Sequence, residues 1–318
     1  MATSGTYSFT VTRDDIIRMA MLFLGKLGEN ETPTASETVD CSAILNMMVK
    51  QWMGRNDFAP GLKVWTRKRA DLYLSSTTGR YSIGPSGDHW TETSYTTTLT
   101  AASAISDTTL TVASISNANA SDYIGVELDD GSLHWTTING APSGSTITIT
   151  TGVASAAASG NRVFFYTTKA QRPLLLDTVV LRNVEGEDTP IDVITLQDYE
   201  FLPSKADTDF KGDPTAVYYE PQLTNGVIYT DVGGAQDVTK KLHITFMEPV
   251  QDFSAATDNP HYPQEWYMAL CWGLARQICP MFNAVWTEEM KINYAEALAM
   301  AKESNPEIVN MYFQPGET

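Results

Sequence analysis

Few residues in this 318-residue chain have the spacing that a reactive centre needs. The four histidines, His89, His134, His243 and His261, include no pair at the HxxxH spacing that places two metal ligands on one helix face. No GxGxxG or GxxxxGK sequence offers a phosphate-binding loop, and no GxSxG sequence presents a serine nucleophile. We therefore expect no metal and no other cofactor.

The densest carboxylates are Asp129 with Asp130, and Glu185 with Glu187 and Asp188. A glycosidase needs two carboxyl groups about 5 to 9 Å apart across a cleft, and spacing in the sequence does not establish a cleft. Both groups fall in predicted turns, where acidic residues are common. A cell-wall hydrolase is therefore the least favoured hypothesis, and we predict that the chain is not an enzyme.

One basic cluster stands out, formed by Lys63, Arg67, Lys68 and Arg69. Alternation along a strand would place Lys63, Arg67 and Arg69 on one face, with Trp65 in the same row. Such a strip could face phosphates of DNA or an acidic partner. The alternative is an edge strand whose charges guard against aggregation, and the sequence does not choose between the two.

Two helices are predicted near the N-terminus. The first follows Thr12, which approximates a capping box with Asp15, and its apolar stripe has 3.6-residue spacing up to Gly28. The second repeats the device at Thr34 and ends at Gly54. This helical hairpin cannot bury its apolar stripe alone, so we expect it to pack on the distant C-terminal helices or on a neighbouring subunit.

The chain ends with two more helical patterns and a short tail. One helix opens at Pro263 and ends or kinks at Pro280, and another runs from near Thr287 to Asn305. The tail that follows holds five sizeable apolar residues: Ile308, Val309, Met311, Tyr312 and Phe313. Because terminal segments that fray are usually polar, we expect this tail to dock on a partner.

Between the helices the apolar pattern changes to the period of two that is typical of strands. Residues 93–168 are rich in Thr, Ser and Ala and contain no lysine, yet Tyr123, Trp135, Phe164 and Phe165 supply core-sized apolar surface. We interpret this stretch as a folded small β-barrel or sandwich inserted into the surrounding domain, and not as a flexible linker.

These patterns predict an α+β fold in which N- and C-terminal helices form a helical bundle beside an antiparallel β-sheet, with an inserted small all-β domain. The predicted parts are residues 1–92 (helical hairpin and first strands), 93–168 (inserted β domain), 169–261 (antiparallel β part), 262–305 (C-terminal helices) and 306–318 (tail).

The net charge of −17 is unevenly spread, since residues 93–166 hold five acidic side chains and one basic one. Such a surface repels polyanions, so tight wrapping of DNA is not expected, although DNA could pass it without sticking. The cysteines, Cys41, Cys271 and Cys279, lie in apolar helical patterns and are interpreted as buried thiols. With no signal sequence and no apolar run long enough for a bilayer, we expect synthesis in the cytoplasm and no membrane insertion.

Taken in order, several short motifs resemble one known family, the head-to-tail adaptor (connector) proteins of short-tailed bacteriophages, including the tail tubular protein A group. The matching segments are Thr12-Arg13-Asp14-Asp15-Ile16-Ile17, Leu24-Gly25, Glu31-Thr32-Pro33, Leu45-Asn46-Met47-Met48 with Trp52, Tyr81-Ser82-Ile83-Gly84-Pro85, Arg172-Pro173-Leu174, Asp198-Tyr199, Gly212-Asp213-Pro214 and Leu274-Ala275. They cover both ends of the chain and the region 172–250. The insertion at 93–168 departs from minimal adaptors.

The resemblance implies a structural virion protein that forms a ring, usually of twelve copies, beneath the portal protein of the DNA-filled head. The ring would connect the capsid to the tail and line the DNA channel, and Ile308 to Phe313 would contact the portal. The insert would meet the tail nozzle or hold tail-fibre proteins. An alternative from another class is a tail-fibre or receptor-contact protein whose Thr-rich insert binds cells or polysaccharide.

Overall fold

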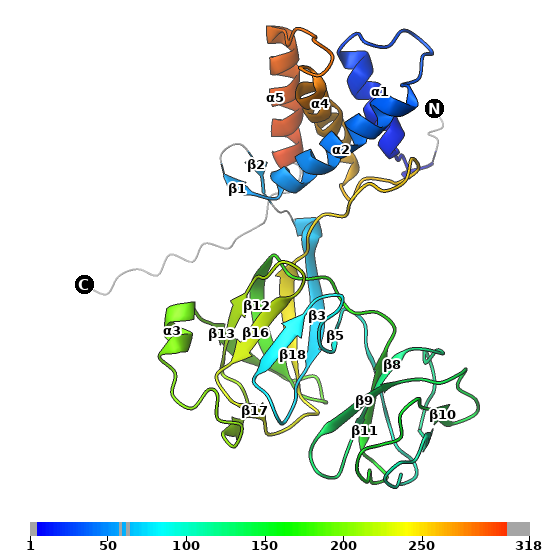
Figure 1. The fold of residues 1–318 in the computed structure, drawn as a ribbon, viewed down its shortest axis with the longest axis vertical. Coiled ribbons are helices and arrows are strands. Elements are labelled where there is room, and N and C mark those ends of the chain that lie inside the picture. The colour runs from blue at the N-terminus through cyan, green and yellow to red at the C-terminus, as the bar shows by residue number, and fades with distance from the viewer. Residues whose placement is uncertain (1–4, 57–58, 62–63, 304–318) are drawn as a thin grey trace. The chain divides into compact units, whose positions relative to one another are not determined.

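The structure is a computed structural model, and it describes residues 5–56, 59–61 and 64–303 (Figure 1). The chain divides into two compact units, one formed by residues 1–66 with 249–318 and the other by residues 67–248. The first unit is mainly helical and the second is built from strands. The finer division into five parts stays a prediction.

The predicted fold class was wrong. Strands account for 28% and helices for 23%, and the dominant element is a nearly closed, barrel-like sheet of eight strands, not a helical bundle. The alternating pattern of a strand reports which face is buried. How many strands share one sheet depends on pairing between remote segments, which alternation does not reveal. Examples are the pairing of β3 (Arg67–Tyr73) with β18 (Lys241–Met247) and of β4 (Arg80–Ile83) with β16 (Gly226–Thr230).

Four helices form the helical unit: α1 (Arg13–Phe23), α2 (Ala35–Trp52), α4 (Tyr267–Ile278) and α5 (Glu288–Glu303). Helices α1 and α2 each begin with a full capping box. The hydroxyls of Thr12 and Thr34 accept hydrogen bonds from the N–H groups of Asp15 and Glu37, and the carboxylates of Asp15 and Glu37 accept from the N–H groups of Thr12 and Thr34. These two predicted helix starts are confirmed. The short strands β1 (Arg55–Asn56) and β2 (Ala59–Pro60) follow α2.

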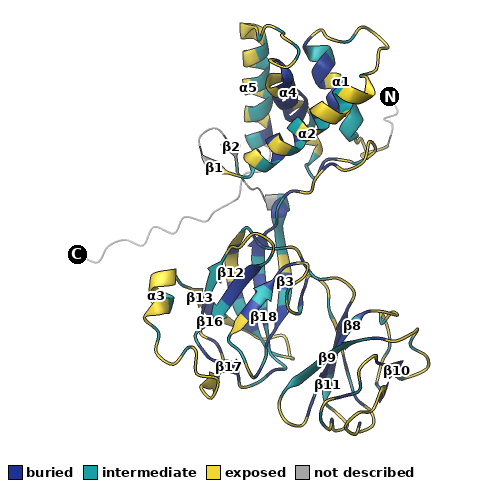
Figure 2. Ribbon diagram, viewed as in Figure 1, coloured by how far each residue is buried: buried dark blue, intermediate teal, exposed yellow. Residues whose placement is uncertain are grey.

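Helices from both ends of the chain share one apolar core. Helix α4 packs against α1, α2 and α5, and its buried face is the darkest part of this unit in Figure 2. Beside it, Trp52, Trp65, Tyr262 and Trp266 form an aromatic cluster with ring centroids 5.3 to 6.5 Å apart. Gly273 makes this packing possible, because a Cβ there would lie 2.7 Å from the Trp52 ring.

The large sheet of the β unit has the strand order β4-β16-β15-β13-β12-β18-β3-β5. Its strands are β3 (Arg67–Tyr73), β4 (Arg80–Ile83), β5 (Trp90–Thr91), β12 (Leu175–Arg182), β13 (Asp188–Val193), β15 (Ala216–Glu220), β16 (Gly226–Thr230) and β18 (Lys241–Met247). All neighbours are antiparallel except β13 and β15, so the predicted antiparallel sheet is in fact mixed. The inner face buries one core that includes Leu72, Ile228, Ile244 and Phe246.

The shorter elements of the β unit lie outside that sheet. They are α3 (Leu196–Glu200), β14 (Lys211–Gly212) and β17 (Gly234–Ala235). Helix α3 has no buried residue (Figure 2), and its Tyr199 stacks on Tyr218 of β15 with centroids 5.8 Å apart. Tyr199 also packs on Tyr229 of β16, with centroids 5.4 Å apart, so two aromatic contacts join the helix to the sheet.

Residues 93–168 have a core of their own within the β unit. The strands are β6 (Tyr95–Thr98), β7 (Thr109–Thr111), β8 (Tyr123–Glu127), β9 (Leu133–Thr137), β10 (Thr146–Thr148) and β11 (Arg162–Tyr166). A four-stranded sheet, β6-β11-β8-β9, stands beside the pair β10-β7, and together they bury Leu110, Ile124 and Phe165. The predicted turn at Asp129 and Asp130 is a hairpin that joins β8 to β9, with Gly131 at a positive φ of 77°.

Candidate functional site

The predicted basic strip lies on β3 and is partly neutralised. Arg67 and Arg69 share one face of the strand, as alternation requires, and Arg67 Nε lies 3.1 Å from the carboxylate of Asp177 on β12. Arg69 is exposed and has no ion-pair partner among the described residues. On the opposite face, Lys68 Nζ lies 3.7 Å from both Glu92 and Glu248. Arg69 is therefore the cation most open to a partner.

Two other members of the predicted strip are placed differently or not at all. Lys63 lies outside the described residues. Trp65 belongs to a 3-10 turn, Val64–Thr66, that precedes β3, so it does not continue the strand's row. Its ring packs 5.3 Å from Trp266 in the helical unit instead. The expectation of an aromatic residue within the basic row was wrong because the strand begins only at Arg67.

The face of β3 that carries Arg67 and Arg69 also carries Asp71, which belongs to a charged network that the sequence did not reveal. The Asp71 carboxylate lies 2.6 Å from Lys241 Nζ and 2.7 Å from His243 Nδ1, and Ser94 donates to it at 3.1 Å. Burial alone would raise the pKa of Asp71, but Lys241 and His243 outweigh it and hold that pKa below its usual range. Asp71 and His243 are 172 residues apart in the sequence, and the pairing of β3 with β18 brings them together.

Four of the five carboxylates considered for catalysis, Asp129, Asp130, Glu187 and Asp188, have hydrogen-bond or ion-pair partners in turns. Asp129 accepts from the Ala158 N–H and the Asn161 side chain, and Asp130 accepts from Ser132. At the β12–β13 turn, Glu187 accepts from the Asn183 amide, and Asp188 forms a two-point ion pair with Arg182 at 2.7 and 2.8 Å. Glu187 lines a small cavity of about 160 Å³ together with Asp213, whose carboxylate is paired with Lys240.

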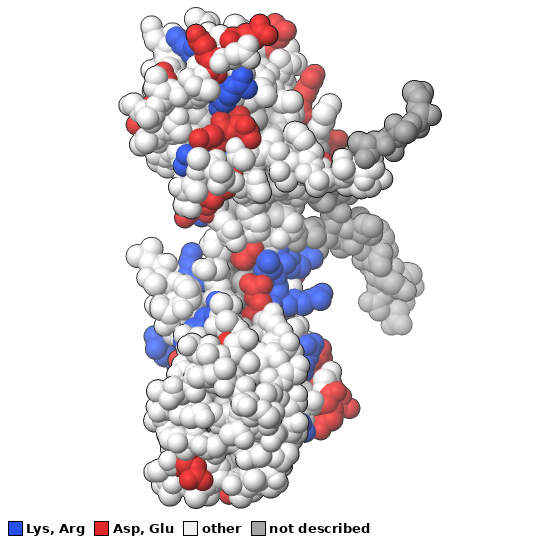
Figure 3. All heavy atoms as spheres, turned by 90° about the vertical axis from the view of Figure 1, so that its right-hand side faces the viewer, with Lys and Arg blue, Asp and Glu red and all other residues white. Residues whose placement is uncertain are grey.

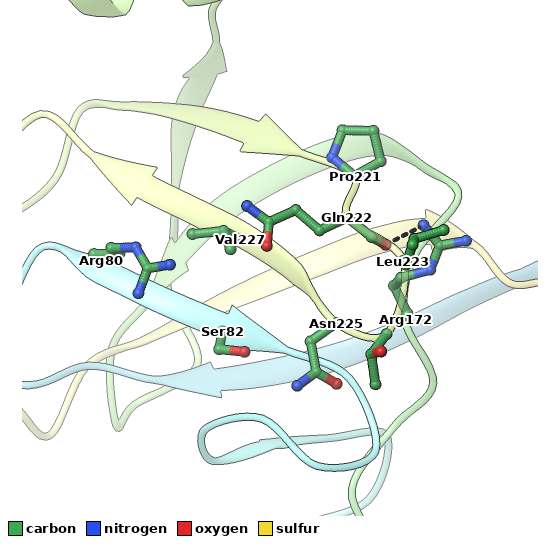
Figure 4. Close-up of a pocket in the computed structure, with 9 residues that line it drawn as sticks. Arg80, Ser82, Arg172, Pro221, Gln222, Leu223, Asn225 and Val227 are labelled. Carbon is green, nitrogen blue, oxygen red and sulfur yellow. Dashed lines mark hydrogen bonds between the residues drawn. The ribbon is translucent and has the colours of Figure 1, made fainter.

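A groove of about 690 Å³ lies on the outer face of β4 and β16 (Figure 4). Arg80 stands at one end and Arg172 at the other, and Arg172 donates to the Gln222 carbonyl at 2.7 Å. The lining contains no Asp or Glu. Gly84 fits the adjoining turn because a Cβ there would lie 2.4 Å from Asn225 Oδ1, and its φ of +150° is one that side chains disfavour.

A second cavity, of about 510 Å³, lies where the inserted module meets the large sheet. Its walls include Tyr73 from the sheet, and Ser132 and Trp135 from the insert. The ring of His89 stacks on that of Trp135 with centroids 3.7 Å apart, and its Nδ1 lies 2.7 Å from the buried Tyr166 hydroxyl.

His89 is held in its neutral form. Burial, reinforced by the charge of Lys169, lowers the pKa of His89 to about 3. Sequence analysis considered His89 only as a metal ligand and found no partner for it. The stacked pair could not be found from sequence, because 46 positions separate His89 from Trp135 and only the fold of the insert brings them together.

Figure 3 shows how unevenly charge is spread over the surface. The insert, which fills the lower half of the view, shows few charged side chains on the face drawn. This agrees with the single basic and five acidic residues of positions 93–166. The insert therefore presents hydroxyl and small apolar groups to its surroundings.

The predicted portal-contacting residues, Ile308, Val309, Met311, Tyr312 and Phe313, lie outside the described residues. Within the described chain, no cluster of three or more His, Cys, Asp or Glu side chains could hold a metal ion, and no helix has the length and apolar content to cross a bilayer. No protein-family model matches the chain, and no curated protein matches it either.

Proposed function

We propose that this chain is a structural virion protein, a head-to-tail adaptor that forms a ring under the portal and joins the capsid to the tail. The observation that carries the proposal is a set of large apolar side chains left exposed on the helical unit. Val39 and Met47 on α2 are 68% and 64% exposed, and Ile292 and Met300 on α5 are 52% and 69% exposed. Exposed apolar surface of this kind is typical of a contact with another protein.

The spacing of these residues suits a ring. Each pair is eight residues apart, a little over two helical turns, so each marks one face of its helix. A closed ring of identical subunits needs two different complementary surfaces on every copy. Helices α2 and α5 offer two such surfaces, because both pack on α4 and leave their opposite faces open. Methionine, which adapts its shape to its neighbours, suits a contact formed only on assembly.

The motifs that suggested the family also have a consistent structural role. Thr12 and Thr34 cap the two N-terminal helices, and Tyr81 to Pro85 form β4 and the turn after it. Leu274 and Ala275 belong to the fully buried side of α4. In the proposed ring, twelve copies would surround the DNA channel, Arg69 would be available to DNA or to an acidic neighbour, and residues 308–313 would contact the portal.

The test is assembly on the portal. Full-length protein is mixed with the portal protein encoded by the same phage, and the complex is imaged by electron microscopy. The proposal requires a ring of this chain on one face of the portal. Failure to bind the portal at any concentration that the protein tolerates would overturn it.

Matched variants localise the contact. Met47→Glu places a charge in the proposed interface and should abolish ring formation. Gln197→Glu adds the same charge at an exposed position on α3 of the β unit and should assemble normally. Both should keep the unfolding temperature of the parent, since neither side chain is buried. Assembly of Met47→Glu at the parental level would show that α2 does not form the ring contact.

A further inference from the structure

Two cavities of the β unit, the groove of about 690 Å³ and the cavity of about 510 Å³ beside the insert, meet at one strand. Both are lined by Arg80 and Ser82, which lie two residues apart on the outer face of β4, with the inward-facing Tyr81 between them. Together the cavities follow β4 from the insert at one end to Arg172 at the other. Because the two cavities share Arg80 and Ser82, an extended ligand could occupy both at once.

The lining is dominated by groups that exchange hydrogen bonds with hydroxyls. The loop from β3 to β4 contributes four successive hydroxyls, at residues 75–78, and the insert contributes Ser132. The turn from β15 to β16 adds the carboxamides of Gln222 and Asn225. A ligand that carries many hydroxyls of its own can satisfy such a lining, because hydroxyls and carboxamides both donate and accept.

Neutral His89 adds a further hydrogen-bonding group to the cavity beside the insert. Its Nδ1 is occupied by the Tyr166 hydroxyl, and its ring is fixed against Trp135, so Nε2 is the ring atom left for a ligand. Because burial keeps the ring uncharged above about pH 4, it recognises a hydroxyl and does not attract anions. Asp88, whose carboxylate already accepts from the Ser82 N–H at 2.7 Å, adds an acceptor near the same wall.

Two cations line the groove of about 690 Å³. Among the described residues of its lining, Arg80 and Arg172 are the only charged ones, although the whole chain carries a net charge of −17. Arg80 also lies over the Tyr229 ring, 5.8 Å from its centroid, which steadies the guanidinium without neutralising it. Guanidinium groups bind carboxylates with two parallel hydrogen bonds, so this part of the groove favours acidic groups on the ligand.

We infer that the groove along β4 binds a linear oligosaccharide that bears carboxylate-containing sugars, such as uronic acids. The hydroxyl-rich wall would hold sugar hydroxyls, and Arg80 and Arg172 would hold the carboxylates. The insert supplies part of the wall, which gives its docking against the large sheet a role beyond packing. This site is separate from the apolar faces of α2 and α5, so either proposal can fail without the other.

The experiment measures binding of the full-length chain to a panel of immobilised linear oligosaccharides, half of them containing uronic acids and half of them neutral. The parent should bind uronic-acid members in preference to neutral ones. Arg80→Ala and Arg172→Ala should each weaken that binding about tenfold or more, since hydrogen bonds to charged groups contribute on the order of 1.5 to 3 kcal/mol. Ser82→Tyr, which fills the point shared by both cavities, should abolish it.

Lys26→Ala is the matched control, because it removes an exposed cation from the helical unit and should bind like the parent. Each variant is checked by thermal unfolding, so that a loss of binding is not a loss of folding. The inference is overturned if the parent binds no saccharide of the panel. It is equally overturned if Ser82→Tyr binds as well as the parent, or if Ser82→Tyr instead prevents ring assembly on the portal, which would make the groove a contact between protein chains.

Discussion

The helical unit and the inserted β module differ in how much large apolar surface they leave exposed to solvent. The insert buries Leu110, Ile124 and Phe165 in a core of its own, and its Phe164 and Tyr166 pack with Tyr73 of the large sheet. Among its described residues, only Ile105 and Tyr95 are exposed large apolar groups. The helical unit has a comparable core but leaves large apolar side chains exposed on α1, α2, α4 and α5. The insert and the adjoining sheet together cover nearly all of the insert's large apolar side chains, whereas the helical unit presents apolar surface that a neighbour would cover.

The two regions also differ in how their outer surfaces interact with water. The insert relies on Thr and Ser hydroxyls and carries little charge, as Figure 3 shows. The helices carry many charged residues between their exposed apolar ones. A neutral hydroxyl surface is compatible with a saccharide ligand, and a mixed apolar and charged surface is typical of contacts between proteins. Four substitutions break or sharpen this comparison.

The largest effect is expected from Trp266→Ala. This side chain is 1% exposed and contacts three aromatic rings, so its removal should lower the free energy of unfolding by about 3 to 5 kcal/mol. Hydrogen exchange should show lost protection in α1, α2 and α4, with the strands of the insert still protected. Equal loss of protection in β8 and β11 would show that the two regions unfold as one.

Asp71→Asn should lower the stability of the β unit by about 2 kcal/mol, because it removes a carboxylate that holds Lys241 and His243. The folded-state pKa of Asp71 is depressed, so its contribution is present above the unfolded pKa near 3.8 and is lost as pH falls through the folded value. Unfolding in urea at pH 7 and pH 3 measures this. Asp192→Asn, an exposed control, should show no such difference; a parent-minus-variant gap that is as large at the lowest pH as at pH 7 would contradict the assignment.

Thr34→Ala removes the cap of α2 and should cost about 1 kcal/mol, since the Glu37 N–H and the Thr34 side chain lose their mutual bond. The neighbouring Thr32→Ala leaves the capping box intact and should be nearly neutral. Thermal unfolding monitored by circular dichroism distinguishes the two. Identical unfolding curves would mean that the cap contributes little to the helical unit.

The smallest effect on stability is expected from Arg69→Glu, within about 0.5 kcal/mol, because the side chain is exposed. Arg67→Glu should cost more, since it places two carboxylates together at Asp177. If the basic strip serves assembly, Arg69→Glu should still reduce ring formation on the portal. Normal assembly of this variant would assign the strip to protection of the strand instead.

Local features were the ones that sequence analysis predicted well. Helix starts at Thr12 and Thr34 were correct because a capping box needs only residues three apart. Helix α4 ends at Ile278, two residues before Pro280. Proline has no backbone N–H donor, so it cannot continue the hydrogen bonds of a helix. The turn that contains Gly131 was also predicted from local sequence, because Asp-Gly steps are favoured where a tight turn needs a positive φ.

Features that depend on remote pairing were missed. The closure of eight strands into one sheet, the parallel pair of β13 with β15, and the meeting of Asp71 with His243 each join segments that have no local signal for one another. Of the candidate site, Arg67 and Arg69 were placed on one face correctly, whereas the groove along β4 was not foreseen. Its lining comes from five separate segments of the chain.

By itself, the sequence determined where helices begin, which stretches alternate as strands, and that residues 93–168 carry hydroxyls where other regions carry charge. These properties depend on backbone hydrogen bonds and side-chain periods within a few residues. Only the tertiary structure decided which strands pair, which cations are neutralised and where the insert encloses a cavity with the sheet. Those outcomes depend on distances between residues far apart in the chain, which the burial of a common core sets and no local pattern encodes.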